Sequence, residues 1–518
     1  MDKYVRASTA IGKLLSKKYG IHMPLYTPID TGKLPANDSD FDSNLLGNNF
    51  QKHISIGCLR CVGEWIAAAS ELIKASNSAS LGNVWETDLG KDLANALITR
   101  RLTLTFADFY ELLKFFALIR DEKLQVLSQL LDVKLKSITQ SNELAQIEVT
   151  KLLQLPLLIH LSNVKVDNKI IEFITFISQY VKRKIINENN GIDLKLCDIV
   201  SAQIGFTNLG LMDQQLMKIL NKKILELPMN TDNSYNLQLY NTSILANTSC
   251  YIHDIEFYAK LIGIINDNLN MLPPSHITTH TLVRAIIANI YHVDNSQILH
   301  IIFKNYRKMS LEDKITVIWS IISLGLDENP EYITMVNNLF TSINNVNISA
   351  FTRLFLDQIY ITAKLDGYIP HYSIITPVKS FNNHTCHDNR HFDDLSRTVK
   401  KLIYNINSNT DKLLDDKFAA KKPETTILGL PYYEFNLVLP LTHQHGTNYD
   451  QRWKGIAITL YKQLNCVDNP LLWDPYYTIR RKHLHKIGYK DVFLPINWID
   501  LSQTQLIYLL DINVNELE

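Results

Sequence analysis

Amphipathic helical stretches follow one another over most of residues 51–365, and they limit the folds that this chain can adopt. Short turns rich in Asn, Asp, Ser, Gly or Pro separate these stretches. Each stretch has an apolar face that a single helix would leave in contact with water. Stacking paired helices in a row buries these faces, so the sequence predicts a helical-repeat, α-solenoid-like body; an irregular helical bundle is the competing prediction.

Two of the stretches share one pattern of apolar residues. TFADFYELLKFFALIR begins at Thr105 and LEDKITVIWSIISLGL begins at Leu311, and a fainter third version begins at Ile348. In the first two, a polar opening leads into an apolar stripe at helical spacing, in which these pairs coincide: Phe109 with Ile315, Leu112 with Ile318, Leu113 with Trp319, Phe116 with Ile322 and Leu118 with Leu324. The second stretch predicts a helix pair, with one helix ending at Leu324, a break over 325–330 and a helix over 331–343.

The charges and cysteines restrict the classes of partner and compartment. Lys plus Arg equals Asp plus Glu at 52 each, so no global field draws the chain to nucleic acid or anionic lipid, and any polyanion site must be a local patch. Six cysteines scattered over 518 residues favour a reducing compartment over a disulfide framework. No apolar run approaches the roughly 20 residues that cross a bilayer, so we expect no membrane span.

The first 25 residues are basic, with five Lys or Arg in MDKYVRASTAIGKLLSKKYG against the single acid Asp2. A basic, acid-poor amphipathic start is what a mitochondrial presequence requires. An ordinary surface helix with a solvated lysine face accounts for the same residues, and both interpretations stay open.

The sequence changes in character after the helical body. Residues 366–420 form a predicted linker followed by a helix, and residues 421–518 form a predicted small α/β domain. Short apolar bursts bounded by Pro and Gly predict strands in this domain, one in FNLVLPLTH from Phe435 and one in GIAITLYK from Gly455. The prediction is therefore a mainly α chain that ends in a small α/β domain.

The stretch TIRRKHLHKIGYKDVFLPINW, from Thr478, predicts a basic helix, a stop and a strand. Tyr476, Ile479, Leu484 and Ile487 supply an apolar face, and Gly488 is a suitable helix end. The basic pairs Arg481 with His485 and Lys482 with Lys486 stand four residues apart on the outer faces. No acid occurs from Arg480 to Lys490. A buried strand over 492–494 follows, and Trp498 is assigned to the core.

The order of these features resembles the end of a RAP domain. That family has a basic helix with a leucine, a glycine followed by an aromatic residue, an apolar strand, a proline and a tryptophan. The corresponding residues here are Ile479, Arg480, Arg481, Leu484, Gly488, Tyr489, Leu494, Pro495 and Trp498. The family's glutamate before the tryptophan is Asn497 in this chain, and the family's earlier acidic strand matches only weakly, with Asn436 and Val438 where acids are expected.

The resemblance implies a restriction-endonuclease-like fold for the C-terminal domain and work on RNA in an organelle. RAP domains commonly follow a helical-repeat body, an architecture similar to octotricopeptide and FAST-kinase-like proteins. The implied function is RNA processing, RNA stability or ribosome assembly in a mitochondrion, with a plastid-type organelle as the alternative. The implied partners are organellar rRNA or mRNA, and mitochondrial ribosomal proteins.

The predicted RNA-binding residues lie on the closing helix and just after it: Tyr477, Arg480, Arg481, Lys482, His485, Lys486 and Lys490. Lys and Arg supply affinity for phosphate, and tyrosine can stack on bases. A solvated helix face and core tyrosines are the competing interpretation. In restriction-endonuclease-like nucleases, clustered carboxylates hold a divalent metal. Because Asn436 and Val438 replace the expected acids, we predict binding without cleavage, no catalytic residues, no metal and no cofactor.

Two rival functions remain open. A structural subunit of the mitochondrial ribosome would use the same basic helix for permanent contact with rRNA. A metal-dependent RNase would need acids elsewhere, and Glu434 and Asp450 are the nearest candidates.

Other chemical motifs are weak. Cys58 and Cys61 lack the second cysteine pair of a structural zinc site. The His-rich loop from His384 fits no zinc-finger spacing, and His443 and His445 lie where the family has a histidine. Motifs of nucleotide-dependent enzymes and serine hydrolases are absent from the sequence.

Overall fold

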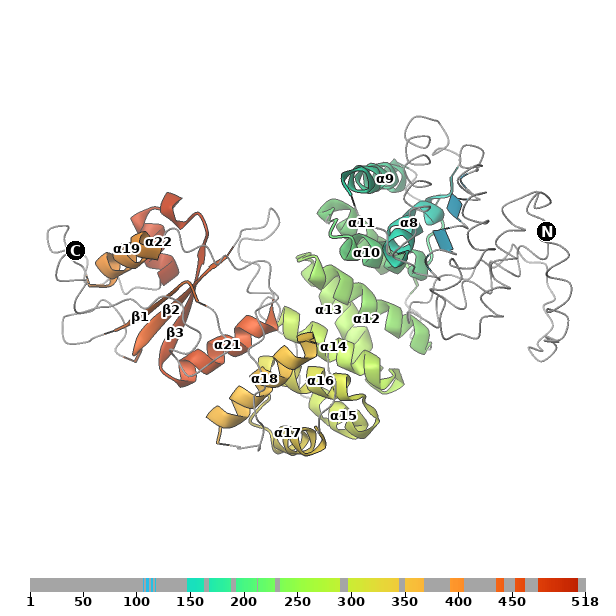
Figure 1. The fold of residues 1–518 in the computed structure, drawn as a ribbon. Helices are drawn as coiled ribbons and strands as arrows, with labels where there is room; N and C mark the ends of the chain where they lie inside the picture. Colours follow the sequence, from blue (N-terminus) through green and yellow to red (C-terminus); the bar gives the residue numbers. More distant parts are fainter. Residues whose placement is uncertain are drawn as a thin grey trace, which may run out of the picture. The chain divides into compact units, whose positions relative to one another are not determined.

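The structure is a computed structural model, shown in Figure 1. It describes residues 147–162, 167–187, 192–211, 213–228, 233–288, 297–343, 350–367, 392–404, 435–441, 452–461 and 474–510, together with Phe106, Phe109, Tyr110, Leu113, Lys114 and Ala117. The chain divides into two compact units, residues 1–261 and 262–518, and each is described by itself. The described part is mainly helical and carries a small three-stranded sheet near its C-terminal end.

The helices of the first unit form two layers. They are α8 (Val149–Leu161), α9 (Asn168–Asn187), α10 (Leu196–Asn208), α11 (Gln214–Glu226) and α12 (Ser234–Ser249), and α13 (Ile255–Asp267) crosses the boundary between the units. Helix α10 packs between α8 and α12, while α9 and α11 pack against each other. Successive helices therefore alternate between the layers.

A glycine and a polar chain of side chains set this packing. A Cβ at Gly205 would lie 2.3 Å from the backbone nitrogen of Leu157, so only glycine lets α10 approach α8 this closely. Across the layers, Gln203 donates to Asn221 at 2.8 Å, and Asn221 donates to Asn247 at 3.0 Å. These buried amides satisfy one another and link α10, α11 and α12.

The second unit begins with the same alternation. Its helices are α14 (Pro274–Ile287), α15 (Ile298–Asn305), α16 (Leu311–Ser323), α17 (Pro330–Ser342) and α18 (Ala350–Leu365), with short 3₁₀ turns η4 (Leu269–Met271) and η5 (Tyr306–Lys308). Helix α16 packs between α14 and α18, and α15 packs against α17.

The helix pair predicted from Leu311 is confirmed. Ser310 caps α16 by accepting a hydrogen bond from the Asp313 backbone N–H at 3.1 Å, and Gly325 follows the helix with φ +73°. The predicted apolar stripe is buried, and so are the corresponding residues of α18: Ile315, Ile318, Trp319, Ile322, Leu354, Phe355, Ile359 and Ile361. In the stretch from Thr105, Phe109 and Leu113 are helical and buried.

The predicted strands and their connection are confirmed as well. Strands β1 (Leu437–Pro440) and β2 (Gly455–Tyr461) are antiparallel, with Leu437 opposite Ile458. Helix α21 (Pro475–Lys486) then crosses to β3 (Tyr489–Pro495), which is parallel to β2 with Gly455 opposite Tyr489. Parallel neighbours need such a crossover.

Alternation along the strands gives the sheet two covered faces. One face packs on α19 (Phe392–Tyr404), the 3₁₀ turn η9 (Trp498–Asp500) and α22 (Gln503–Leu510), and Trp498 lies in this core as predicted. Its strand residues are Leu437, Leu439, Ile456, Ile458, Leu460, Val492 and Leu494. The opposite face carries Thr459, Asp491 and Phe493 and packs on α21. The result is a three-layer α/β/α arrangement (Figure 1).

In the part of the chain that the structure describes, no helix is both long enough and apolar enough to cross a bilayer. The predicted presequence, residues 1–25, lies outside the described residues.

Candidate nucleic-acid interface

Helix α21 holds most of the predicted RNA-binding residues, and its ends are set by local chemistry. Asp474 caps the helix by accepting a hydrogen bond from the Tyr476 backbone N–H at 2.9 Å, and Pro475 occupies the first turn. Gly488, with φ +87°, follows its end. Between these ends, α21 lies between the sheet and helices α16 and α18 (Figure 1). Its basic side chains therefore have three different surroundings.

The face toward the sheet buries Arg480. The guanidinium group donates to both carboxylate oxygens of Asp491, from Nε at 3.2 Å and from an Nη atom at 2.7 Å. The same Nη atom donates to the Thr459 hydroxyl at 2.9 Å. Arg480 is only 1% exposed. Burial works against the charged guanidinium, but the neighbouring carboxylate raises the pKa of Arg480.

Aromatic rings complete the surroundings of Arg480. Its guanidinium lies 4.8 Å from the ring centre of Tyr477, 5.1 Å from that of Phe435 and 5.2 Å from that of Phe493. The sequence predicts RNA contact for Arg480 and Tyr477, but both side chains are buried inside the domain. Arg480 stands four residues from Tyr476 and from Leu484, so it continues their buried stripe, and this spacing was the signal of its burial.

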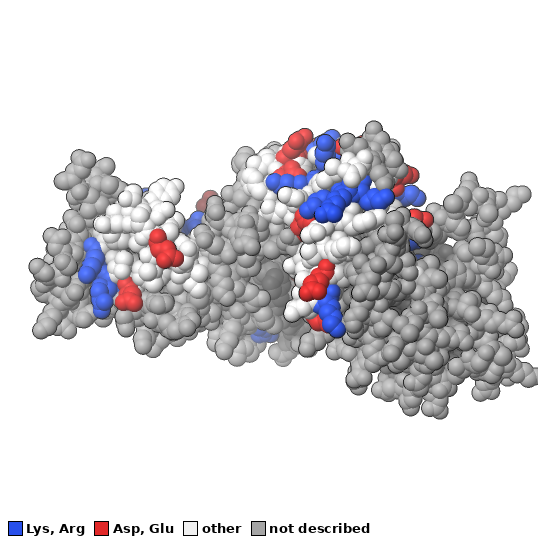
Figure 2. Space-filling view, turned by 90° about the horizontal axis from the view of Figure 1, so that it is seen from above, with Lys and Arg blue, Asp and Glu red and all other residues white. Residues whose placement is uncertain are grey.

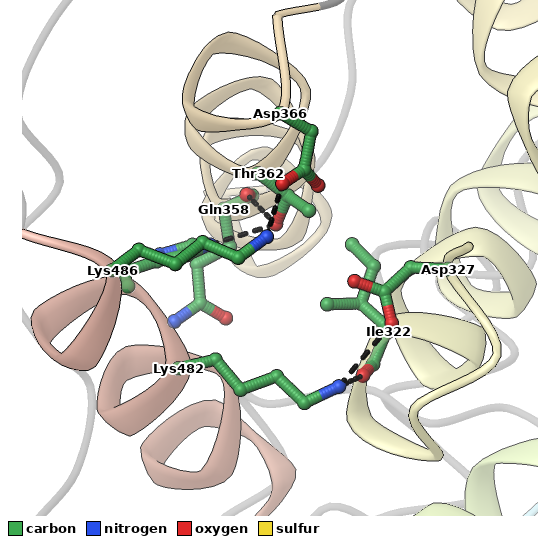
Figure 3. Close-up of polar contacts among 8 residues, drawn as sticks. Ile322, Asp327, Gln358, Thr362, Asp366, Lys482 and Lys486 are labelled. Carbon is green, nitrogen blue, oxygen red and sulfur yellow. Dashed lines mark hydrogen bonds and ion pairs between the residues drawn. The ribbon is translucent and has the colours of Figure 1, made fainter.

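A second face of α21 places two lysines at the ends of two helices (Figure 3). Lys482 donates to the Ile322 carbonyl in the last turn of α16 and pairs with Asp327 at 3.3 Å. Lys486 pairs with Asp366, directly after α18. Helix C-termini carry partial negative charge, which favours cations there. The charges that were predicted to bind phosphate are therefore compensated inside the second unit.

Between these lysines, one glutamine joins three helices. The Gln358 side chain of α18 accepts from the Trp319 indole of α16 at 2.6 Å. It also donates to the Tyr476 carbonyl of α21 at 3.1 Å. Trp319 and Phe355 stack with ring centres 3.8 Å apart. Helix α21 therefore closes the layer of α14, α16 and α18 as well as one face of the sheet.

His483 is buried in the same interface and held neutral. Its Nε2 lies 2.7 Å from the Thr362 hydroxyl, which donates its single proton to the Gln358 carbonyl, so the imidazole is the donor to Thr362. Burial, followed by the positive charges of Lys486 and Lys482, lowers the pKa of His483 to about 3.

This shift predicts an acid-sensitive interface. In the unfolded chain a histidine takes up a proton near pH 6.5, but folded His483 does so only near pH 3. Between these values the unfolded state binds more protons, so the free energy of unfolding falls with pH by up to about 1.4 kcal/mol per pH unit. Urea unfolding of the full chain at pH 6, 5 and 4 should therefore show a shallower pH dependence for His483→Gln than for the wild type.

His485→Gln is the matched control, since His485 lies on the same helix but is exposed. It should leave the pH dependence closer to that of the wild type. Equal pH dependence in wild type and His483→Gln would contradict a buried neutral imidazole.

The third face of α21 is open and basic. Arg481 and His485 lie one turn apart on it, and Lys490 follows at the start of β3. Lys454, just before β2, lies alongside because its backbone N–H donates to the Gly488 carbonyl at 2.7 Å. Arg452 is exposed nearby in the chain. We call Arg452, Lys454, Arg481, His485 and Lys490 the α21 basic surface.

Two aromatic rings border the α21 basic surface. The Trp453 and His485 rings have centres 4.7 Å apart. Tyr489 lies over Gly455, where an added Cβ would be 2.4 Å from the tyrosine ring. Burial lowers the pKa of His485, and the positive charges of Arg481 and Lys490 lower it further. The surface therefore combines positive charge with partly exposed rings.

Arg452, Trp453 and Lys454 are additional to the residues that the sequence predicts for this surface. They precede β2, about 30 residues before the end of α21. Only the parallel pairing of β2 with β3 brings both strand starts to one edge of the sheet. The cation–aromatic–cation order in RWK was the signal available in the sequence.

The positions that would hold nuclease acids are structural here. The Asn436 side chain accepts from the Leu460 backbone N–H at 2.7 Å, Val438 is buried, and the Asp491 carboxylate is held by Arg480. Within the described ranges, no group of three or more His, Cys, Asp or Glu is placed to hold a metal ion. The other sequence candidates lie outside the described residues: His53, Cys58, Cys61, His384, Cys386, His387, His391, Glu434, His443, His445 and Asp450.

On the face shown in Figure 2, Lys and Arg side chains of the described residues are mixed with Asp and Glu. This mixture agrees with the balanced total charge and gives the α21 basic surface its interest as a local patch. No protein-family model matches this chain, and no curated protein matches it either.

Proposed function

We propose that this protein is a non-catalytic RNA-binding protein of an organelle, and that the α21 basic surface contacts the RNA backbone. The observation that carries the proposal is the meeting of Lys454, Arg481, His485 and Lys490 beside Trp453 and Tyr489. Positive charge supplies affinity for phosphate, and neighbouring rings stack on unpaired bases. Single-stranded RNA is the partner that suits both features.

Regular spacing of the helices supports a helical-repeat body. Helix α10 begins at Leu196 and α12 at Ser234, 38 residues later. In the second unit, α16 begins 37 residues after Pro274, where α14 starts, and α18 begins at Ala350, 39 residues after α16. Together with the two alternating layers, a nearly constant spacing is typical of stacked helical pairs.

The order of elements supports the resemblance to a RAP domain. The chain runs α19, β1, β2, α21 and β3, with β2 and β3 parallel. This order suits a restriction-endonuclease-like core, in which acids on the strands would bind a metal. Here Asn436 and Val438 are not acids, and Arg480 occupies the Asp491 carboxylate. We therefore propose that the domain binds RNA without cutting it.

The mitochondrion is the proposed compartment, with a plastid-type organelle as the alternative, on the strength of the RAP-like motif and the basic N-terminal residues. Within that compartment, RNA processing, RNA stability and ribosome assembly are the proposed roles. A permanent subunit of the mitochondrial ribosome would instead co-sediment with ribosomal subunits at high salt.

Binding of the purified full chain to a single-stranded RNA of about 20 nucleotides tests the proposal. Each cation in contact with single-stranded phosphate contributes about 0.7 to the slope of log K against log salt. Four contacts therefore predict a slope of about −3, which is a loss of about 50- to 100-fold between about 50 and 200 mM salt. Absence of binding at low salt, or cleavage of the RNA with added Mg²⁺, would contradict the proposal.

A further inference from the structure

A second basic surface lies on α15 and η5 of the second unit. The segment from Ile298 to Ser310 contains three cations and no acid. Its apolar residues turn inward, and Tyr306 is anchored because its hydroxyl donates to the Met335 carbonyl of α17 at 3.1 Å. The outward side chains are His300, Phe303, Lys304, Arg307 and Lys308, and Phe303 is 40% exposed.

The cations of this segment differ from most lysines of the unit in having no acidic partner. Lys482 and Lys486 are paired with Asp327 and Asp366. By contrast, no carboxylate lies within 4.0 Å of the charged groups of Lys304, Arg307, Lys308 or Lys314, as far as the described residues go. The nearest acids in sequence are Glu312 and Asp313, and Asp313 is occupied by the Ser310 hydroxyl at 2.7 Å.

Lys314 extends this charge into the first turn of α16. Its Nζ lies 5.4 Å from the ring centre of Tyr306, so the ammonium group is held next to η5. Four neighbouring cations without acidic partners repel one another and favour a polyanionic partner. We call Lys304, Arg307, Lys308 and Lys314 the α15 basic surface.

Helix α16 connects the two basic surfaces. The α15 basic surface lies at its N-terminal end, because η5 runs directly into α16. Helix α21 is held at its C-terminal end through Lys482 and the Ile322 carbonyl. A helix of 13 residues is about 20 Å long, so the two surfaces are separated by about that length along its axis. Single-stranded binding sites of 4 to 16 nucleotides cover such a separation (roughly, for one small domain).

We propose that the α15 basic surface is a second phosphate-contact site, and that one RNA strand occupies it together with the α21 basic surface. This inference rests on the proposed function, since it assigns a further contact for the same RNA. Phe303 then takes the role of a stacking ring at the second site, as Trp453 and Tyr489 do at the first. The proposal identifies the path of the strand as parallel to α16.

Charge reversal tests the second site. The variant Lys304→Glu, Arg307→Glu and Lys308→Glu changes only exposed residues, so the fold should persist. With a single-stranded RNA of about 20 nucleotides, we expect about 10- to 100-fold weaker binding and a salt slope that is less steep by about 2. The wild type should bind one strand per protein.

A control with the same change of net charge is Arg183→Glu, Lys218→Glu and Lys222→Glu on α9 and α11 of the first unit, where all three side chains are exposed. An equal loss in this control would assign the effect to net charge and overturn the proposal. Full affinity in the α15 variant would overturn it as well, while loss of affinity on reversing the α21 basic surface would leave the proposed function standing.

Two further outcomes separate the inference from the proposed function. If the wild type binds no RNA, both fail together. If it binds vesicles rich in anionic lipid through Lys304, Arg307 and Lys308 but binds no RNA, the α15 basic surface is a lipid contact and the inference is wrong.

Discussion

Arg480→Met is expected to lower the free energy of unfolding by about 3–5 kcal/mol, because it leaves the Asp491 carboxylate buried without its partner. The loss includes two charge-assisted hydrogen bonds to Asp491 and one bond to Thr459. The affected elements are α21, β2 and β3, which carry the candidate site. Urea unfolding at pH 7, followed by tryptophan fluorescence, measures the change.

Two variants show whether the effect belongs to the buried pair. Arg481→Met, one residue further along α21, removes a partly exposed guanidinium over Phe493 and should cost less than about 1 kcal/mol. The double variant Arg480→Met with Asp491→Leu removes both charges, and it should recover part of the stability lost in Arg480→Met. A loss below about 1 kcal/mol in Arg480→Met would show that Arg480 is not buried as the structure has it.

Reversing Lys454, Arg481 and Lys490 to Glu is expected to weaken binding of single-stranded RNA by about 100-fold or more, since three phosphate contacts become repulsive. The salt slope should become less steep by about 2 for the three contacts. Binding titrations at several salt concentrations measure both quantities. Because these side chains are at least partly exposed, the thermal midpoint should change by only a few degrees.

A neutral variant guards against misfolding in that experiment. Arg481 rests on Phe493 and the Lys454 stem rests on Gly488, so changing all three residues to Gln removes charge with less disturbance of packing. It should give a smaller loss of affinity than the reversal and the same change of slope. Unchanged affinity in a folded reversal variant would exclude the α21 basic surface as the RNA contact.

Local patterns in the sequence were sufficient to predict most helices and strands. Periodic apolar residues marked α16, α17, α18 and α21, and short apolar bursts marked the strands. The constant spacing of the helix starts was not visible, because the repeat units share few residue identities and the turns vary in length. That spacing emerged only from the observed starts of the helices.

The role of each basic residue on α21 depended on distant partners. The sequence identified the pairs Lys482 with Lys486 and Arg481 with His485, but both pairs looked alike as solvated faces. Asp327 and Asp366, which receive the two lysines, are more than 100 residues away in the chain. Arg480 differed, because its place between Tyr476 and Leu484 was a local signal of burial.

Ultraviolet crosslinking of the full-length protein to RNA in cells, with both the RNA and the crosslinked peptides sequenced, tests the central claim most directly. The account predicts organellar RNA, with crosslinks on peptides that contain Trp453 or Tyr489, since these rings border the α21 basic surface. Crosslinks confined to other parts of the chain, or none above the level of a protein that does not bind RNA, would contradict it.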